Sequence, residues 1–285
     1  MIGAVGHNGV APPLPPLRDV IARHDLKPKR KLGQHFLLDA NLTGRIARAA
    51  GDLHGVNVIE IGPGPGGLTR SLLAAGAGRV IAVEKDHRCI AAIEELSDAF
   101  PGRLSVIEAD ALECDVRTLA SPPRRIVANL PYNIAAPLLV RWLHVADALL
   151  GMTLMVQKEI ADRLLAAPRS SNYGRLSVIA QWLCEVRREF NVDRNAFTPP
   201  PKVMSTVITL TPRPTPLAPA SWRALEQVTA AAFGQRRKML RQSLKALGID
   251  PRTVGVEPTR RAEELSIEAF CALARVHAEK TAHQP

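Results

Sequence analysis

The sequence has few cysteines, and none of them are paired. The four cysteines of the 285 residues, Cys89, Cys114, Cys184 and Cys271, lie far apart in the chain and form no C-x-x-C motif. Neither a zinc ribbon nor a disulfide framework is therefore predicted. We expect reduced, mostly buried thiols and no metal site.

Long hydrophobic runs are also lacking. A membrane-spanning helix needs about 18 uninterrupted apolar residues, and charged residues interrupt every hydrophobic stretch of this chain. The N-terminus has no basic region before an apolar run, and it carries prolines at positions 12, 13, 15 and 16, so no secretory signal is predicted. We interpret residues 1–17 as a flexible leader and expect a cytoplasmic protein without membrane contact.

Acidic residues are in the minority, with 27 Asp and Glu against 37 Lys and Arg, for a formal net charge of +10. The excess is uneven: residues 18–48 hold eight basic and three acidic side chains, and residues 187–245 hold eleven and three. A positive surface favours polyanions, because neutralising phosphates releases their counterions. Nucleic acid is the first candidate partner, although a basic composition alone also fits proteins that bind none.

The middle of the chain alternates short apolar runs with helical patterns. Runs rich in Val and Ile occupy residues 56–61, 79–85, 104–110, 125–130 and 151–157, and apolar spacings of three and four occupy 67–76, 87–100 and 136–146. Parallel strands joined by crossover helices have this pattern. We predict a doubly wound α/β sheet, a helix or mixed element at 175–186 and a further strand at 205–212.

A proline-rich stretch follows the last predicted strand. Residues 212–221 contain four prolines and almost no core-forming residues, which is typical of a linker between domains. Beyond it, residues 222–248 and the segment near 267–280 show helical periodicity. We therefore predict a catalytic domain over 18–213 and a small helical domain over 214–285.

A glycine-rich turn follows the first predicted strand, with Gly62, Gly64, Gly66 and Gly67 interrupted by prolines. Glycines let the backbone turn tightly and approach a ligand closely. Glu84 ends the next strand, where a carboxylate can accept hydrogen bonds from ribose hydroxyls of either NAD or S-adenosylmethionine. Asp110 ends the third strand and is suited to an adenine amino group, which favours S-adenosylmethionine.

The fourth strand runs into Asn129, Leu130, Pro131 and Tyr132. The exocyclic amine of adenine is a poor nucleophile because its lone pair is delocalised into the ring, so an enzyme must hold this amine and draw the nitrogen towards tetrahedral geometry. The side-chain oxygen of Asn129 and a main-chain carbonyl within Leu130-Pro131 can each accept one hydrogen of the amine, while Tyr132 stacks on the base. Positioning and electrostatics would then dominate catalysis, without a general base.

The sequence resembles the KsgA/RsmA family of small-subunit ribosomal RNA adenine dimethyltransferases, with the Erm methyltransferases as relatives. The resemblance runs from about residue 27 to near the end of the chain. It rests on seven ordered blocks: KLGQHFL (31–37), EIGPGPGGLT (60–69), NLPYNI (129–134), QKE (157–159), YGRLS (173–177), FTPPPKV (197–203) and QRRK (235–238).

The resemblance implies a Rossmann-like class I S-adenosylmethionine-dependent methyltransferase domain with a small C-terminal α-helical domain, acting as a monomer. It also implies roles for individual residues. The cofactor would be contacted by His35 and Leu37, by Gly62 and Gly64 at its methionine portion, by Glu84 at the ribose, by Asp110 at the adenine, and by Asn129. Phe197 would close on the target adenine opposite Tyr132, with Asn129, Leu130 and Pro131 around the reacting amine.

The same resemblance implies two adjacent adenosines in the 3′ terminal hairpin loop of 16S rRNA as the target, within the 30S subunit or its precursor. A looped RNA also suits the site, because the base must be splayed out to reach Asn129. We expect phosphate contacts from basic residues that would cover more than one side of a helix near 236–245 and from the N-terminal basic segment: Lys29, Arg30, Lys31, Arg236, Arg237, Lys238 and Arg241.

Four alternatives remain at this stage. An Erm-type enzyme on 23S rRNA would share the catalytic residues and differ mainly in the helical tail. A noncatalytic 30S assembly factor would use the basic surfaces but would not need the motif at 129–132. A DNA adenine methyltransferase would be expected to carry D/N-P-P-Y instead, and an NAD dehydrogenase would have no use for these residues.

Overall fold

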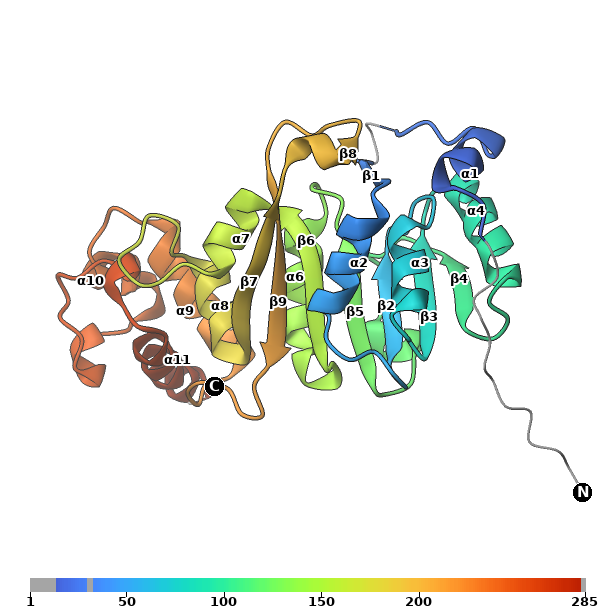
Figure 1. Cartoon of the computed structure of the whole chain (residues 1–285). Helices are drawn as coiled ribbons and strands as arrows, with labels where there is room; N and C mark the ends of the chain where they lie inside the picture. The colour runs from blue at the N-terminus through green and yellow to red at the C-terminus, as the bar shows by residue number, and fades with distance from the viewer. Residues whose placement is uncertain (1–13, 30–32, 283–285) are drawn as a thin grey trace, which may run out of the picture.

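A computed structural model describes residues 14–29 and 33–282 of the protein (Figure 1). Its centre is a seven-stranded sheet in the order β4-β3-β2-β5-β6-β9-β7. The strands are β2 (Asn57–Ile61), β3 (Arg79–Glu84), β4 (Leu104–Glu108), β5 (Arg124–Asn129), β6 (Gly151–Gln157), β7 (Cys184–Val192) and β9 (Ser205–Pro212). β2 to β6 are parallel to one another, whereas β9 runs antiparallel to both β6 and β7.

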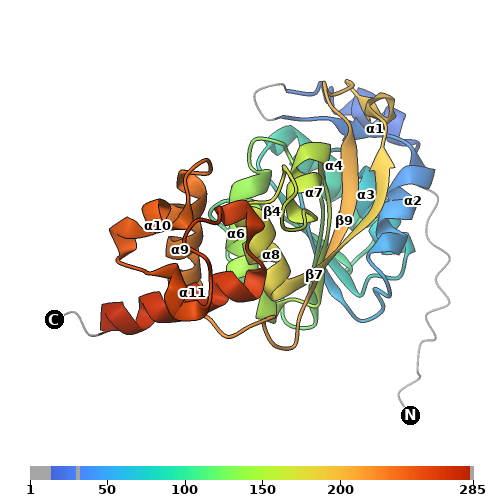
Figure 2. The ribbon, with the colours of Figure 1, turned by 90° about the vertical axis from the view of Figure 1, so that its left-hand side faces the viewer.

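Helices cover both faces of this sheet, as the ribbon in Figures 1 and 2 shows. One face packs against α2 (Ala40–Ala49), α3 (Gly67–Ala74) and α4 (His87–Asp98), which share a buried apolar cluster with β2 and β3. The other face packs against α5 (Val116–Leu119), α6 (Ala135–His144), α7 (Lys158–Leu164) and α8 (Arg175–Leu183) in a second cluster. Strands buried on both faces read as nearly continuous apolar runs, which is why the sequence shows them clearly.

The predicted α/β fold class is confirmed, and the strands and helices predicted before residue 213 agree with the observed ones to within a few residues. The mixed element predicted at 175–186 divides into α8 and the start of β7. Three of the four cysteines, Cys89, Cys184 and Cys271, are buried, and Cys114 is half-buried; all four are free thiols, as expected.

Short elements near the N-terminus were not predicted. α1 (Leu17–Arg23) packs beside α4, and β1 (Phe36–Leu37) pairs antiparallel with β8 (Phe197–Thr198). The described part of the expected leader is hydrogen-bonded to α3, because the Arg70 guanidinium donates to the Pro15 carbonyl at 2.6 Å. The rest of the leader, residues 1–13, lies outside the described residues.

The tail is helical, as expected, but its helices are shorter than the periodicity predicted. α9 (Trp222–Gly234) ends at Gly234, and α10 (Leu240–Ser243) and α11 (Ile267–Ala282) follow, with 3-10 turns at Lys245–Leu247, Pro251–Val254 and Ala262–Glu264. The prediction of one helix carrying the basic residues near 236–245 is therefore wrong. Gln235 leaves helical geometry, with φ −127° and ψ 56°, so Arg236, Arg237 and Lys238 lie in a turn between helices.

The helical tail packs directly on the catalytic part. α9 and α11 share a third apolar cluster with α8, to which Tyr173 and Trp182 contribute. The proline-rich stretch before α9 is bound to α8 as well, because the Leu217 N–H donates to the Trp182 carbonyl at 2.9 Å and the Trp182 indole donates to the Ala218 carbonyl at 2.8 Å. The division of the chain into two domains near residue 213 stays a prediction.

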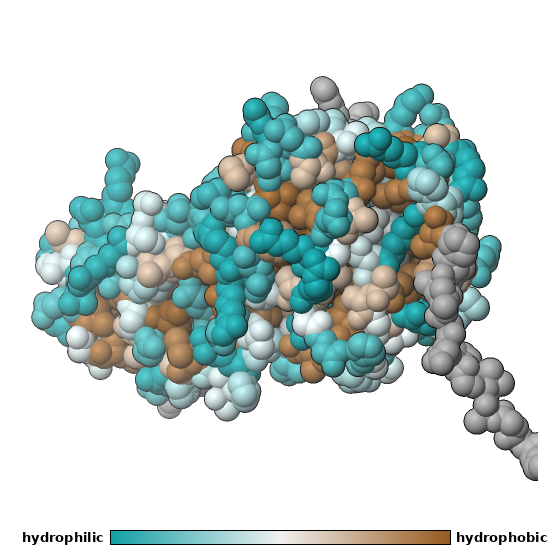
Figure 3. Space-filling view, in the orientation of Figure 1, coloured by the Kyte–Doolittle hydropathy of each residue, from teal (hydrophilic) through white to brown (hydrophobic). Residues whose placement is uncertain are grey.

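The face drawn in Figure 3 is mostly hydrophilic, with hydrophobic patches broken up by polar residues. Within residues 14–29 and 33–282, no helix has the length and apolar character needed to cross a membrane.

Candidate active site

The predicted cofactor-binding residues and Asn129 to Tyr132 meet at the carboxyl edge of the parallel strands, whereas Phe197 does not line the cavity there. The chain runs from β2 outwards to β3 and β4, and then returns to the other side of β2 at β5, so the strand order reverses between β2 and β5. Near their carboxyl ends these two strands are paired at Ile61 and Ala128. Ligands of open α/β sheets bind at such switch points. A cavity of about 270 Å³ lies here. Its lining includes His35, Leu37, Gly62, Gly64, Glu84, Asp110, Asn129, Leu130, Pro131 and Tyr132, and also Gln34, Glu60 and Lys85.

The glycine-rich turn needs its glycines for two reasons. Gly62, Gly64 and Gly66 have φ of +67°, +55° and +90°, in the left-handed region that disfavours other residues. Gly67 starts α3 with an ordinary φ, but a Cβ there would lie 2.6 Å from the Leu37 carbonyl oxygen. β1 and the start of α3 can therefore approach closely only when this position has no side chain.

Glu84 ends β3 and is 7% exposed. Its Oε2 accepts the Gly64 N–H at 3.1 Å, and its Oε1 accepts the N–H groups of Lys85 at 2.8 Å and Asp86 at 2.9 Å. Burial raises the pKa of this carboxyl, and the three N–H donors oppose that rise. The carboxylate is thus held rigidly against the glycine turn, with Oε2 retaining a lone pair for a ligand hydroxyl.

Asp110 lies two residues beyond the end of β4, not at the strand end as predicted. Its Oδ2 accepts the Lys85 ammonium at 2.6 Å and its Oδ1 accepts the Leu112 N–H at 3.0 Å. The Lys85 hydrogen bond lowers the pKa of Asp110. Each oxygen keeps one acceptor position, so an amino group can still be bound.

Glu60 was not singled out from the sequence. Its side chain lies inside the sheet, 1% exposed, and accepts the Thr69 hydroxyl at 2.6 Å. Burial raises its pKa to about 8, so the carboxyl is largely protonated at neutral pH. The signal was an acidic residue within the apolar strand directly before the glycine turn.

Asn129 ends β5 with a defined amide orientation. Its Nδ2 donates to the His35 carbonyl at 3.2 Å, so Oδ1 is the atom left to accept a hydrogen from a substrate amine. Leu130 is buried, and its N–H donates to the Met155 carbonyl at 3.1 Å. The Pro131 carbonyl accepts the Ile134 N–H at 3.2 Å, which leaves the Leu130 carbonyl as the better second acceptor.

The two aromatic residues assigned to base stacking do not face an open slot. The His35 ring stacks on Tyr132 at 5.6 Å between centroids and meets Phe197 edge-on at 6.3 Å. The Tyr132 hydroxyl lies 2.8 Å from Ser205 Oγ, and Phe197 is 2% exposed within the core. His35 Nδ1–H donates to the Pro199 carbonyl at 2.7 Å, which joins it to the turn after Phe197. Stacking of a base by Phe197 stays a prediction.

The residues present fit S-adenosylmethionine. The carboxylates of Glu84 at the end of β3 and of Asp110 beyond β4 suit hydroxyl and amino donors of a nucleoside, and the glycine turn leaves room for backbone contact with an amino-acid portion. Among the described residues, no cluster of His, Cys, Asp and Glu suitable for a metal ion is present.

The residues predicted to bind RNA differ in their surroundings. Arg237, Lys238 and Arg241 are exposed. Arg236 pairs with Glu263 at 2.9 Å and donates to the Ser171 carbonyl at 2.6 Å, so it joins the tail to the loop before α8. Lys29 points to Asp86 at 3.4 Å. Arg30 and Lys31 lie outside the described residues.

Comparison with known proteins shows the family. A family profile described as "Ribosomal RNA adenine dimethylase" matches residues 25–279. The chain belongs to the ribosomal RNA adenine dimethylase family. It is 65% identical over 266 residues to Ribosomal RNA small subunit methyltransferase A of Paramagnetospirillum magneticum, covering 92% of this chain and 94% of that protein. The Rhodospirillum rubrum protein of the same name is 61% identical, over 92% of this chain and 92% of that protein.

Two solved structures extend this dimethylase family likeness to the fold. A dimethyladenosine transferase from Plasmodium falciparum is similar with a TM-score of 0.74 and 26% identity, over 87% of this chain and 98% of that one. The 23S rRNA methyltransferase ErmE is similar with a TM-score of 0.63 and 28% identity, over 84% and 98%. The methyltransferase class and the S-adenosylmethionine cofactor expected from the sequence are confirmed by the family.

Proposed function

We propose that this protein transfers methyl groups from S-adenosylmethionine to N6 of two adjacent adenosines in the 3′ terminal hairpin loop of 16S rRNA, dimethylating each during small-subunit biogenesis. The observation that carries the proposal is the fixed amide of Asn129 in the lining of the cavity beside the glycine turn. The relatives at 65% and 61% identity, both named for the small subunit, support this RNA over the 23S rRNA of the ErmE enzyme.

The chain's own residues would hold and orient the target amine. In the first transfer, Asn129 Oδ1 and the Leu130 carbonyl would each accept one N6 hydrogen, which draws the nitrogen lone pair out of conjugation with the ring. N6 loses one hydrogen as a proton to solvent with each methyl group that it gains, so only one of the two acceptors holds a hydrogen in the second transfer. Rigidity matters because two acceptors act together only when their separation is fixed. The His35 carbonyl fixes the first acceptor, and the Leu130 N–H bonded to Met155 fixes the second.

The cofactor would lie with its ribose against Glu84, its adenine near Asp110 and its methionine portion along the glycine turn at Gly62 and Gly64. When bound, S-adenosylmethionine supplies an already activated methyl group on a sulfonium. The protein then needs no group to activate the donor, and its task is to align the acceptor nitrogen and exclude water.

RNA binding would be shared between the catalytic part and the helical tail. Arg237, Lys238 and Arg241 are exposed on the tail. Lys29, Arg30, Lys31 and Arg236 stay predicted contacts. We assign residues 214–285 as the RNA-binding domain, because its exposed basic side chains can contact phosphates. Phosphate contacts fix the orientation of an RNA without reading its sequence. Reading of the target would be left to the cavity.

The test offers labelled S-adenosylmethionine separately to undermethylated 30S particles, 50S particles and DNA, and maps the modified nucleotide. We expect label only in 30S, as N6,N6-dimethyladenosine at two neighbouring positions. Label in 50S would instead identify an Erm-type enzyme. Stable 30S binding with no label at all would identify an assembly factor.

The role of Asn129 is tested by Asn129→Ala, which removes one amine acceptor and should lower the single-turnover rate at least 100-fold while 30S binding stays within twofold. Asn57→Ala is the matched control, because Asn57 also donates its amide to a main-chain carbonyl, that of Ser121, at the opposite edge of the sheet. Equal rates for both variants would refute the assigned role.

A further inference from the structure

Within residues 14–29 and 33–282, a local motif occurs three times and is buried in one of the three. Asp86, Asp115 and Asp250 each precede a helical turn, accept the N–H of the residue two positions on, and pair with the guanidinium of an arginine at that position. The pairing distances are similar, at 2.7 Å, 2.7 Å and 2.8 Å. The side chain of Asp86 is 0% exposed, whereas those of Asp115 and Asp250 are 38% and 44% exposed.

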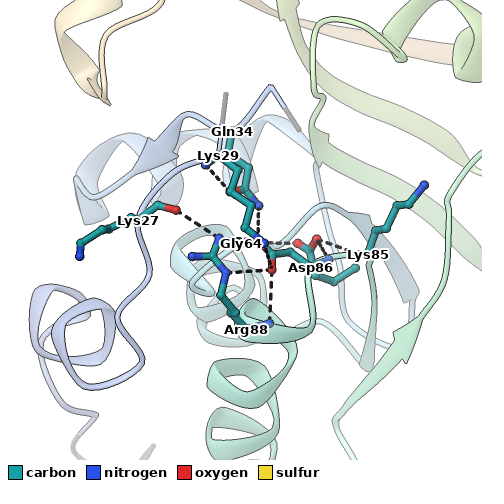
Figure 4. A network of polar contacts seen from close by, with 8 residues as sticks. Lys27, Lys29, Gln34, Gly64, Lys85, Asp86 and Arg88 are labelled. Carbon is teal, nitrogen blue, oxygen red and sulfur yellow. Dashed lines mark hydrogen bonds and ion pairs between the residues drawn. The ribbon is translucent and has the colours of Figure 1, made fainter. Parts of the chain in front are cut away.

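The burial of Asp86 comes from a distant segment of the chain. Gln34 Nε2 donates to Asp86 Oδ2 at 3.1 Å, and the Lys29 ammonium lies 3.4 Å from Oδ1. The partner arginine takes part too, because Arg88 donates to the Lys27 carbonyl at 3.2 Å. Figure 4 shows Lys29 and Gln34 pointing towards Asp86 at the start of α4, while Lys85 points away.

Lys29 and Gln34 are also hydrogen-bonded to each other. The Lys29 N–H donates to Gln34 Oε1 at 2.9 Å, and the Gln34 N–H donates to the Lys29 carbonyl at 3.4 Å. Gln34 thus uses its amide oxygen on Lys29 and its amide nitrogen on Asp86. Hydrogen bonds with an ionised partner are about twice as strong as neutral ones, and Arg88 and Gln34 hold the pKa of Asp86 well below its usual range.

The cluster of Asp86, Arg88, Lys29 and Gln34 is connected both to Glu84 and to the segment that contacts Asn129. On one side, the Asp86 N–H donates to Glu84 Oε1, so the loop that carries Asp86 also orients the carboxylate assigned to the cofactor ribose. On the other side, Gln34 is followed by His35, whose carbonyl accepts the Asn129 amide, and by β1. Asp86 itself does not line the cavity, whereas Glu84 and Gln34 do.

We propose that Asp86, with Arg88, is a positioning residue for methyl transfer: it ties the segment carrying Lys27, Lys29 and Gln34 to the Glu84 loop, so that the ribose carboxylate and the His35 carbonyl that orients Asn129 are held in one fixed relation. The proposal rests on the roles assigned above to Glu84 and Asn129. An ordinary helix cap, as at Asp250, would hold only its own helix.

The first test measures the Kd for S-adenosylhomocysteine by calorimetry, without RNA, so that the identity of the RNA does not enter. Asp86→Asn keeps an oxygen to cap α4 and removes the charge. We expect a Kd about 10-fold higher, measured at a temperature at which both variants are folded. The Tm should fall as well, because the buried pair of Asp86 and Arg88 stabilises the folded state. Asp250→Asn is the matched control, and we expect its Kd to stay unchanged.

The second test is a double-mutant cycle with Gln34→Met. If both changes break the same link, the Kd of the double variant should be about equal to the higher of the two single-variant Kd values. Gln34→Met and Asp86→Asn effects that simply multiply would overturn the link, as would an unchanged Kd in Asp86→Asn. Should Asp86→Asn fail to fold, Arg88→Gln serves instead, and we expect faster amide hydrogen exchange at Lys29 and Gln34; unchanged exchange would overturn the proposal.

A kinetic split separates positioning from capping. At saturating cofactor, Asp86→Asn should still transfer methyl groups about fivefold more slowly, because Asn129 loses its fixed orientation. A full rate at saturation would overturn the connection to Asn129. Failure of the wild type to bind S-adenosylhomocysteine would instead count against the proposed function itself.

Discussion

At the scale of single residues, Glu60 combines a carboxyl group with complete burial. Its pKa in the folded protein, about 8, lies above the ordinary value of 4.5, so between these pH values the folded state binds more protons than the unfolded state. The free energy of unfolding must therefore fall as pH rises through this window. Glu60→Gln removes the titration and keeps an acceptor for the Thr69 hydroxyl.

We predict that Glu60→Gln, without cofactor, matches the wild type at pH 5 and exceeds its free energy of unfolding at pH 8 by on the order of 3 kcal/mol. Urea unfolding at both pH values measures the difference. Parallel pH profiles for the two proteins would contradict the raised pKa.

Phe197 is both a predicted substrate contact and a buried core residue, so a substitution there affects stability as well as stacking. Its ring is 2% exposed in a cluster with Leu37, Val192 and Val207, so Phe197→Ala would cost about 3–5 kcal/mol through the cavity it leaves. Any loss of rate in that variant would confound stability with stacking.

Phe197→Leu keeps apolar volume and removes the flat face. If the ring stacks on the target adenine, we predict a single-turnover rate roughly 10-fold lower, within the ~1–3 kcal/mol range of base stacking, with the cofactor Kd unchanged. A rate equal to that of the wild type would leave Phe197 as a core residue only.

At the scale of elements, the closeness of β1 and α3 depends on one missing side chain. A Cβ at Gly67 would lie 2.6 Å from the Leu37 carbonyl oxygen, a backbone atom that cannot move without its strand. β1 is held by β8 on its other side. The strain would therefore pass to the segment that carries His35.

We predict that Gly67→Ala raises the cofactor Kd at least 10-fold and lowers the Tm. Gly234→Ala is the control, because Gly234 also lies at a helix end with ordinary φ and has open space where the Cβ would be. Calorimetry and thermal melts of the two variants give the comparison. Equal behaviour would show that β1 adjusts freely.

Periodicity predicted the long elements because burial on both sheet faces leaves an unbroken apolar signature. It could not predict β1 and β8, since a two-residue strand has no period and its partner lies about 160 residues away. The site followed the same rule. Residues at strand ends, such as Glu84 and Asn129, were legible from sequence, whereas the contacts of Gln34 with Asp86 and of His35 with Asn129 depend on chain pairing that no local pattern contains.

At the scale of the whole molecule, the excess of positive charge should act through position. Lys238 is exposed in the turn after α9, and Arg79 is exposed at the amino edge of the parallel strands, opposite the cavity. Lys238→Glu and Arg79→Glu change the net charge equally. We predict that Lys238→Glu weakens 30S binding and lowers the salt-dependence slope by roughly one, while Arg79→Glu does neither. Equal effects would mean that only overall charge matters.

The proline-rich stretch predicted as a linker connects parts that share the apolar cluster of α8, α9 and α11. All three tryptophans of the sequence, Trp142, Trp182 and Trp222, lie where α6, α8 and α9 meet, and the Trp182 and Trp222 rings are 6.4 Å apart. Tryptophan fluorescence therefore reports on this junction, and far-UV circular dichroism reports on the whole chain. If the junction is part of one cooperative unit, the two signals change together.

Phe270 of α11 provides the perturbation that distinguishes one unit from two. It is fully buried and its ring lies 5.4 Å from Phe233, so Phe270→Ala should cost about 3–5 kcal/mol in the helical tail. With a shared core, we predict that fluorescence, circular dichroism and S-adenosylhomocysteine binding are lost together at a lower temperature. The opposite outcome is a tail that melts at a lower temperature while the catalytic part keeps its ligand up to the wild-type melting temperature. That result would mean that the packing between α8 and α9 contributes little to stability.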